Sequence, residues 1–325
     1  MGAREIEMTM SALAAGCRLW VDDPAGFTTH RIGRLHHTYQ SHPLFQLSEL
    51  EALAEELVPF KQCRFMRPGA TQASAFAHDS QHPDGRSIAE VFRRIEEPGS
   101  WIALYDVEVI PRYRALLDHI LDNVRSIIDR EQPGMFLVTG FIFISAPPSV
   151  TPFHIDRENN FWLMLRGRKV MNVWDRTDRF VVPQNLVEDY IVAHDPRKIR
   201  LQDAFTARSH EFETLPGDGV YFPSTSPHMT RSDTAWARPG DGVAISIGVN
   251  FYTSVTRNTA RVLQFNRLMR KCGLTPSVPG ESPRLDAMKR PFGRVIGATR
   301  HRAISVAMPV LRNGRRAGPP PPGSY

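Results

Sequence analysis

The chain has 325 residues, of which 42% are hydrophobic and 23% are charged. This composition is typical of a folded globular protein and argues against a disordered or fibrous chain. The sequence contains no run of about 18 or more apolar residues, so we expect no membrane span and no membrane partner.

The cysteines and the N-terminal residues indicate in which cellular compartment the protein is expected. Cys17, Cys63 and Cys272 lie far apart and form no CxxC pair, which argues against a disulfide framework or a structural zinc site. Such usage is typical of a reducing cytoplasm, where we expect this protein. Ser11–Cys17 resembles a lipoprotein cleavage box, but acidic residues precede it and its apolar run is short, so export is disfavoured.

The first third of the chain is expected to be mainly helical. We interpret residues 1–40 as an N-terminal extension and 41–253 as one catalytic domain with a helical first part. Leucines at helical spacing predict a helix over 48–57, and a short amphipathic stretch predicts another over 88–95. A longer apolar stripe, opened by a proline that suits a first helical turn, predicts a helix over 111–130.

The middle of the chain is expected to form strands. Residues 136–145 are largely β-branched and aromatic, and a Pro-Pro pair follows them. The apolar runs 161–165 and 170–174, separated by Arg-Gly-Arg, predict a hairpin whose second strand begins at Lys169. Residues 243–252 predict a closing strand.

Beyond the strands, a helix is expected over 254–272, within a C-terminal helical segment that extends to residue 283. Residues 284–325 contain nine basic residues against Asp286 alone, a net charge of +8 that leaves −2 for the rest of the chain. Because this tail ends in Gly318–Tyr325, which is rich in proline, we expect it to be disordered. We favour a solvated, solubilising end over an arm that binds nucleic acid, because aromatic residues are not interleaved with the basic ones.

The most informative motif is Thr151-Pro-Phe-His154-Ile-Asp156, followed much later by His228. In an extended strand, His154 and Asp156 point to the same face and can hold one cation. His228, which follows a tight turn and an apolar run, is the best third ligand. Two histidines and one carboxylate leave three octahedral positions free, the arrangement of non-haem Fe(II) oxygenases. His-x-Asp alone is a weak signal, since a solitary strand histidine is as often an ordinary surface or core residue.

Lys169 allows two interpretations. It is either a solvated hairpin lysine or a cation at the back of the metal cavity, next to the strand that carries His154 and Asp156. In the second case its ammonium would anchor the far carboxylate of a dicarboxylate cosubstrate.

The motif, together with Asn160-Phe161, Gly167-Arg-Lys169 and Val249-Asn250-Phe-Tyr252, resembles the jumonji-C (cupin-like) Fe(II)/2-oxoglutarate oxygenases over roughly 136–253. The resemblance implies a mainly β protein with flanking helices (α+β), in which a double-stranded β-helix, or jelly roll, is braced by N-terminal and C-terminal helices. It also implies that the C-terminal helices form a homodimer.

The resemblance also implies roles for individual residues. His154, Asp156 and His228 would hold iron, and Lys169 with Thr151 would bind the distal carboxylate of 2-oxoglutarate. The remaining residues that it assigns to the cosubstrate pocket are Asn160, Asn250 and Tyr105. The tyrosine is assigned on a loose match, and a packed aromatic residue is the alternative interpretation. The polar stretch 232–241 is interpreted as an insertion before Asn250.

The predicted function is hydroxylation of an unactivated C–H bond with O2, in a peptide or protein side chain or in an amino-acid-derived substrate, giving succinate and CO2 as coproducts. One alternative is a metal-binding cupin that uses no 2-oxoglutarate, such as another dioxygenase or an isomerase, although Thr151, Asn160 and Lys169 argue against it. A second alternative is a regulatory or nucleic-acid-binding module that uses the basic tail. The polar stretch 78–84 is interpreted as a mobile flap over the active site.

Overall fold

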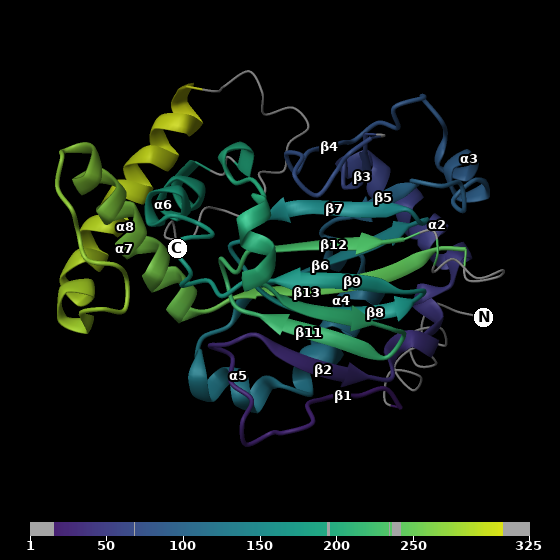
Figure 1. Ribbon diagram of the computed structural model, residues 1–325, viewed down its shortest axis with the longest axis horizontal. Helices are drawn as coiled ribbons and strands as arrows, with labels where there is room; N and C mark the ends of the chain where they lie inside the picture. Colours follow the sequence, from purple (N-terminus) through teal and green to yellow (C-terminus); the bar gives the residue numbers. More distant parts are fainter. Residues whose placement is uncertain (1–15, 68, 194–195, 234, 236–241, 308–325) are drawn as a thin grey trace.

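The computed structural model describes residues 16–67, 69–193, 196–233, 235 and 242–307, the last nine of these by their backbone alone. Two antiparallel sheets face each other, and helices pack around them (Figure 1). The larger sheet contains, in spatial order, β1 (Leu19–Trp20), β2 (Gly33–His37), β11 (Asp218–Phe222), β8 (Asn159–Arg166), β13 (Ala244–Tyr252), β6 (Phe136–Ser145), β5 (Trp101–Leu104), β3 (Cys63–Met66) and β4 (His78–Asp79). The smaller sheet contains β10 (His210–Thr214), β9 (Lys169–Val173), β12 (His228–Ser232) and β7 (Ser149–His154).

Strands β6 to β13 form the barrel. The larger sheet takes β6, β8, β11 and β13, whereas the smaller sheet takes β7, β9, β10 and β12. The chain therefore passes back and forth between two facing sheets, which is the strand order of a jelly roll. This order confirms the predicted double-stranded β-helix with flanking helices.

The alternation of side chains along the strands separates the barrel interior from its outer core. On β6, Ile142 and Ile144 point outward and belong to the main hydrophobic core under the helices, while Phe141 and Phe143 line the interior cavity. The outer core packs the larger sheet against α2 (Leu47–Leu57) and α4 (Pro111–Asp122). Alternate residues along the strand therefore have different roles: one set packs in the hydrophobic core, and the other set lines the cavity of the candidate site.

The predicted hairpin of β8 and β9 is wrong in its pairing. Both strands lie close to the predicted ranges, but β8 pairs with β11 and β13, whereas β9 pairs with β10 and β12. The chain crosses between the sheets at Gly167, whose φ is +75°. A Cβ at this position would lie 2.9 Å from the backbone of Ala244, so a side chain would clash there. Since β12 lies between β7 and β9, Lys169 does not lie on the strand next to His154.

The helices largely follow the predicted ranges. Besides α2 and α4, they are α3 (Ile88–Arg93), α5 (Arg125–Glu131), α6 (Gln184–Ala193), α7 (Ser254–Lys271) and α8 (Pro283–Ala307). The single helix predicted over 111–130 is divided into α4 and α5, because residues 123 and 124 interrupt it. Short 3-10 helices are η1 (Tyr39–Ser41), η2 (Pro43–Phe45), η3 (Val58–Phe60), η4 (Val107–Val109), η5 (Pro196–Lys198) and η6 (Asp203–Arg208).

The prediction of a disordered tail from residue 284 is wrong for its first part. Residues 283–307 form α8, which packs along α7 even though Pro291 lies inside it. Gly293 and Gly297 face α7, where a Cβ would lie within 3 Å of α7 atoms, so the two helices approach closely. Tertiary packing thus overrides the weak local helix signal. Residues 308–325 lie outside the described residues.

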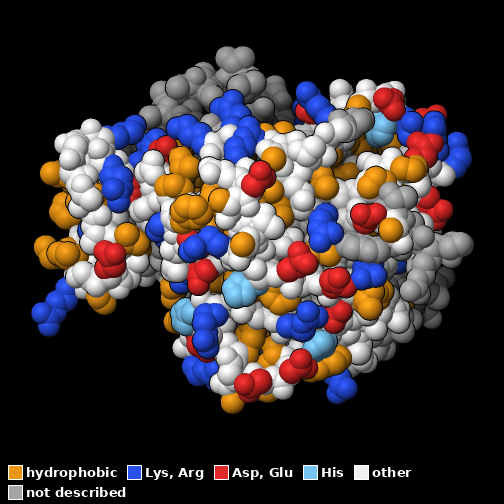
Figure 2. All heavy atoms as spheres, in the orientation of Figure 1, with side chains coloured by type: hydrophobic (Ala, Val, Ile, Leu, Met, Phe, Trp, Pro, Cys, Tyr) orange, Lys and Arg blue, Asp and Glu red, His pale blue; other side chains and the backbone are white. Residues whose placement is uncertain are grey.

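Helices α6, α7 and α8 gather at one end of the barrel (Figure 1). On α8 several apolar side chains are exposed, namely Leu285, Met288, Phe292 and Val295. Figure 2 shows hydrophobic side chains at the outer edge of this helical lobe.

The structure also bears on the expectations for the N-terminal residues, the cysteines, membrane spans and the insertion. The described part of residues 1–40 contributes β1 and β2 to the larger sheet, and the predicted domain limits stay predictions. Cys17, Cys63 and Cys272 are free thiols. None of the helices in the described residues is long and apolar enough to cross a membrane. Most of the predicted insertion at 232–241 lies outside the described residues.

The outer core gives a direct test of the fold. Leu163 on β8 is fully buried between the larger sheet and the helices, so Leu163→Ala should lower the free energy of unfolding by about 2 to 5 kcal/mol. Leu215 is 54% exposed, so Leu215→Ala should change the free energy of unfolding by less than about 0.5 kcal/mol. Urea denaturation followed by circular dichroism would measure both. Equal losses in the two variants would contradict the placement of β8.

Candidate metal centre

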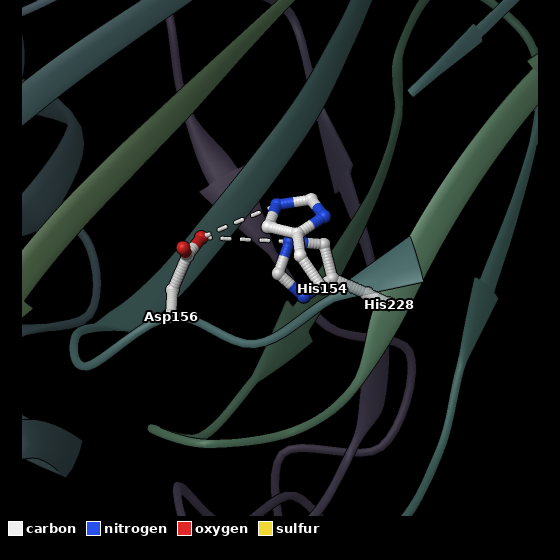
Figure 3. Close-up of side chains that lie close together, drawn as sticks. All are labelled: His154, Asp156 and His228. Carbon is white, nitrogen blue, oxygen red and sulfur yellow. Dashed lines mark ion pairs between the residues drawn. The ribbon is translucent and has the colours of Figure 1, made fainter. Parts of the chain in front are cut away.

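The structure brings His154, Asp156 and His228 together at the end of the barrel near α6 and α7. His154 ends β7 and His228 begins β12, and the two residues are directly paired across these strands. The Asp156 Oδ2 atom lies 3.8 Å from His154 Nε2 and 3.5 Å from His228 Nε2 (Figure 3). All three donor atoms lie within 4.8 Å of one another.

A β-bulge sets the geometry of β7. His228 pairs with His154, but Thr230, two residues further on β12, pairs with Thr151, three residues back on β7. The extra residue in β7 lets both His154 and Thr151 point into the barrel, which strict alternation over three residues would forbid. Both line the same cavity.

Asp156 reaches the site from a loop, so the prediction that it shares a strand face with His154 is wrong. The strand ends at His154, and the loop that follows is hydrogen-bonded to the loop that precedes His228. Thr225 N donates to Asp156 O at 2.8 Å, and Ser224 Oγ donates to Arg157 O at 2.7 Å. These bonds fix the carboxylate relative to His228, although the two segments are far apart in sequence.

Backbone carbonyls orient the two imidazoles. The Nδ1 atom of His154 lies 2.7 Å from Pro152 O, and that of His228 lies 3.1 Å from Ser226 O. Each contact is a hydrogen bond when Nδ1 carries the proton. The lone pair of each ring is then on Nε2, the atom that faces Asp156, as in metal sites where a second hydrogen bond fixes the tautomer.

The electrostatics of the site suit a divalent cation. Burial lowers the pKa of His228 well below its ordinary value, so this imidazole is neutral and its lone pair is available. Burial raises the pKa of Asp156, an effect that the charges of His154 and Arg157 oppose. A cation among the three donors would compensate for the desolvation of the carboxylate. Two imidazoles and one carboxylate, with the remaining positions open, suit a non-haem ferrous ion.

Lys169 lies in the same cavity as this triad. It begins β9, its side chain is almost fully buried, and it lines the cavity together with Thr151 and Asn160. Burial alone lowers the pKa of its ammonium to about 8. In the described part of the chain, no carboxylate and no hydrogen-bond acceptor contacts this ammonium. A buried cation without a counterion is costly unless an anion joins it.

Other polar groups in the cavity also lack partners among the described residues. They are Asn160 Oδ1, Thr230 Oγ1 and Ser246 Oγ. Our reading of the sequence missed Thr230 and Ser246. The signal was present, because Thr230 lies two residues after His228 and Ser246 lies four residues before Asn250, so each shares a strand face with a predicted site residue.

The two remaining predicted residues lie next to the cavity. Asn250 is fully buried opposite Asn160 in the β13–β8 pair, and its Oδ1 has no hydrogen-bond partner among the described residues. Tyr105 follows β5, and its ring lies 4.6 Å from that of the cavity residue Phe141. Burial, and then the negative charge of Asp156, raise the pKa of Tyr105. The tyrosine is thus near the triad as well as packed among aromatic rings.

A short segment before β4 covers the outer edge of β7. Gln72 O accepts a hydrogen bond from Phe153 N at 2.9 Å, and the ring of Phe76 stacks on His154 with 4.2 Å between centroids. His78 lies in β4, where its ring packs against Tyr105. Burial is the main cause that lowers the pKa of His78 to about 4. The first two residues of the flap predicted over 78–84 therefore form the strand β4.

Comparisons with known proteins give a likeness in fold. No protein-family model and no curated protein matches the chain. A solved structure of YcfD, a ribosomal oxygenase from Escherichia coli, is 15% identical with a TM-score of 0.41, over 82% of this chain and 61% of that one. YcfD with cobalt and 2-oxoglutarate is 14% identical with a TM-score of 0.44, over 91% and 70%. A cupin barrel protein from Salinispora arenicola is 15% identical with a TM-score of 0.22, over 37% and 66%.

The chain spans about 61% of the length of the first YcfD structure. At such identities and TM-scores the likeness does not extend to activity or substrate, so the functional conclusion depends on the geometry of the site.

The triad predicts one divalent metal site. The protein should bind Co2+, a spectroscopic substitute for ferrous iron, at one site, and His154→Ala, Asp156→Ala or His228→Ala should each weaken binding by at least about 100-fold, since each removes a donor. Calorimetry and the visible absorption of bound cobalt would measure this. His210→Ala, which changes an exposed histidine on β10, should bind as the unchanged protein does.

The unpaired ammonium predicts a gain of stability on its removal. A pKa shift from 10.5 to about 8 corresponds to about 3 kcal/mol, so Lys169→Met should raise the free energy of unfolding by about 1 to 3 kcal/mol at pH 7. The cost is fully present below pH 8, where the buried lysine is protonated, and it declines as the pH rises toward 10.5. Thermal denaturation at pH 7 and pH 10 would test the sign. A destabilised Lys169→Met protein at pH 7 would show that the ammonium has a partner.

Proposed function

We propose that this protein is an Fe(II)- and 2-oxoglutarate-dependent oxygenase that hydroxylates an unactivated C–H bond. The observation that carries the proposal is the pairing, in one cavity, of a two-histidine, one-carboxylate donor set with a buried ammonium that has no counterion among the described residues. The first group suits a ferrous ion and the second suits the far end of a dicarboxylate.

The chain's own residues would hold the metal. His154 and His228 would each offer the Nε2 lone pair that their carbonyl-bonded Nδ1 atoms leave free, and Asp156 would supply one negative charge. The bound iron and 2-oxoglutarate would supply the oxidation with O2, giving succinate and CO2. The protein's contribution is then ligand geometry, exclusion of water and placement of the substrate.

The cavity offers a matching set of contacts to the diacid. Lys169 and Thr151 would bind its distal carboxylate by a charge-assisted hydrogen bond and a hydroxyl contact. Asn160 and Asn250, with unpaired Oδ1 atoms, would line the pocket between that carboxylate and the metal. Tyr105 would contribute from the neighbouring aromatic cluster. Binding would offset the cost of burying the lysine.

The alternatives explain fewer of these groups. A cupin without 2-oxoglutarate, whether another dioxygenase or an isomerase, would leave Lys169 buried without an anion. A purely regulatory module would have no need for three oriented metal donors. We favour a peptide or protein side chain, or an amino-acid-derived molecule, as the substrate. We also propose a cytoplasmic location, where ferrous iron is maintained, and a homodimer through the exposed apolar residues of α8.

Turnover of the cosubstrate gives the test. With Fe(II), ascorbate and 2-oxoglutarate, the protein should form succinate slowly, as measured by NMR, and faster with its true substrate. His154→Ala and Asp156→Ala should abolish this turnover because they remove metal donors. Lys169→Met should chiefly raise the KM for 2-oxoglutarate, by at least about 100-fold, because the loss of a buried charge pair costs about 3 kcal/mol or more.

Matched controls separate the roles. Lys169→Arg keeps the positive charge and should retain part of the affinity that Lys169→Met loses, while both should still bind Co2+. If Lys169→Met bound 2-oxoglutarate as tightly as the unchanged protein, the cosubstrate assignment would be wrong. Metal binding without any succinate formation in the unchanged protein would favour the cupin alternative.

A further inference from the structure

Thr230 occupies a central position in the smaller sheet and lines the cavity of the candidate metal centre. Strand β12, which carries Thr230, lies between β7 and β9. Thr230 is paired directly with Thr151 on β7 and with Met171 on β9. Lys169 lies two residues before Met171 and therefore on the same face of β9. All four side chains line the cavity.

The order of these strands has a consequence for any ligand that contacts both Thr151 and Lys169. Neighbouring strands lie about 4.8 Å apart, so β7 and β9 are separated by about 10 Å, with β12 between them. A carboxylate that is held by the Lys169 ammonium and the Thr151 hydroxyl at once would therefore lie over β12. Because Thr230 is paired with Thr151, it is at the level of that contact.

The Thr230 hydroxyl has no partner in the part of the chain that the structure describes. Its side chain is buried, and its Oγ1 atom forms no hydrogen bond with a described residue. A buried hydroxyl without a hydrogen bond is unfavourable, whereas valine would fill the same space on a strand without that cost. The hydroxyl is therefore available to a ligand that accepts a hydrogen bond.

Two further hydroxyls that line the cavity can also donate to a ligand. Trp101 Nε1 donates to Thr151 Oγ1 at 3.4 Å, and this contact does not use the hydroxyl proton of Thr151. Ser246, on β13 of the larger sheet, is paired with the cavity residue Phe143, and its Oγ has no partner among the described residues. The cavity thus presents hydroxyl donors from both sheets.

The number and kind of these donors match one carboxylate. A carboxylate accepts about four hydrogen bonds and donates none. The Lys169 ammonium and the hydroxyls of Thr151, Thr230 and Ser246 are four donor groups in one cavity, and only the ammonium carries a charge. A neutral acceptor would leave that charge uncompensated, so the set favours an anion with a single negative charge.

We propose that Thr230 and Ser246 bind the distal carboxylate of 2-oxoglutarate together with Lys169 and Thr151, and that these hydroxyls make the pocket selective for a keto acid with a second carboxylate. This inference rests on the proposed function, because it assigns further residues to the same cosubstrate. The family resemblance assigns neither Thr230 nor Ser246 to this carboxylate.

Calorimetric titration of the Co2+-loaded full chain with 2-oxoglutarate would measure the contribution of each hydroxyl without turnover. Thr230→Val keeps the shape of the side chain, and Ser246→Ala removes only the hydroxyl. Each should weaken the binding of 2-oxoglutarate by about 10- to 100-fold, because a hydrogen bond to a charged group is lost. 2-Oxopentanoate, which has the same number of carbons but no distal carboxylate, should bind weakly and equally to all three proteins.

Matched variants separate a contact with the ligand from a general effect on the barrel. Ser232→Ala removes a hydroxyl two residues further along β12 that is hydrogen-bonded to Ser149, and it should leave the affinity unchanged. Thr230→Ser keeps the hydroxyl and should retain most of the affinity. Without ligand, Thr230→Val should unfold at the same temperature as the unchanged protein or higher, because it removes a buried hydroxyl that has no partner. All variants should bind Co2+ as the unchanged protein does.

The outcomes distinguish this inference from the proposed function. If the unchanged protein binds 2-oxoglutarate and Thr230→Val and Ser246→Ala bind it equally well, the inference fails while the proposed function stands. An equal loss in Ser232→Ala, or an equal loss of 2-oxopentanoate binding, would also contradict the inference, since the hydroxyls would then not act on the distal carboxylate. Absence of 2-oxoglutarate binding by the unchanged protein would overturn both.

Discussion

The candidate site depends on the burial of the Lys169 ammonium, which has no anionic partner among the residues that the structure describes. Two imidazoles and one carboxylate meet within 4.8 Å, and no carboxylate of the described part of the chain contacts the lysine ammonium in the same cavity. Burial disfavours the charged forms of Lys169 and Asp156, whereas the two imidazoles are hydrogen-bonded to backbone carbonyls. A metal ion would compensate for the burial of the Asp156 carboxylate, and a dicarboxylate would compensate for the burial of the Lys169 ammonium. The larger sheet, with its dense outer core, supplies the stability that lets the barrel interior remain in this state.

Local sequence patterns predicted the central strands β6, β8, β9 and β13 and the helices α2, α3 and α7, because hydrophobic periodicity and turn residues act over short distances. They did not predict the strands β1 to β5, which lie in a part of the chain that was expected to be mainly helical. Strand β6 has the predicted limits, and α7 differs by one residue. The pairing of β8 with β9 could not be predicted in this way. A short Gly-containing link looks the same whether two strands pair or pass into opposite sheets, and only the twist and closure of the barrel decide. The helix at 283–307 was missed for a similar reason, since its formation depends on packing against α7 through Gly293 and Gly297.

The site was easier to predict in identity than in geometry. His154, Asp156, His228 and Lys169 have side chains whose chemistry is distinctive in any context, and the structure brings them to one cavity. The bulge in β7 and the loop position of Asp156 depend on hydrogen bonds to segments about 70 residues away, which a local pattern does not contain. Thr230 and Ser246 were missed because hydroxyl residues on strands are common, and only their unpaired oxygens in the cavity distinguish them. The neighbourhood of Tyr105 likewise depends on packing between distant strands.

The segment that covers β7 has a consequence for how this fold can vary. β7 is one of the two edge strands of the smaller sheet, so its backbone groups on the outer side could recruit a strand from another molecule and begin aggregation. The Gln72 carbonyl takes up one of these groups, and the Phe76 ring covers the adjacent histidine. The same stretch of chain therefore protects the sheet from self-association and covers part of the candidate metal centre. Mutations that displace this segment would open the candidate metal centre and expose the edge of the sheet at the same time, which links access to the centre with solubility.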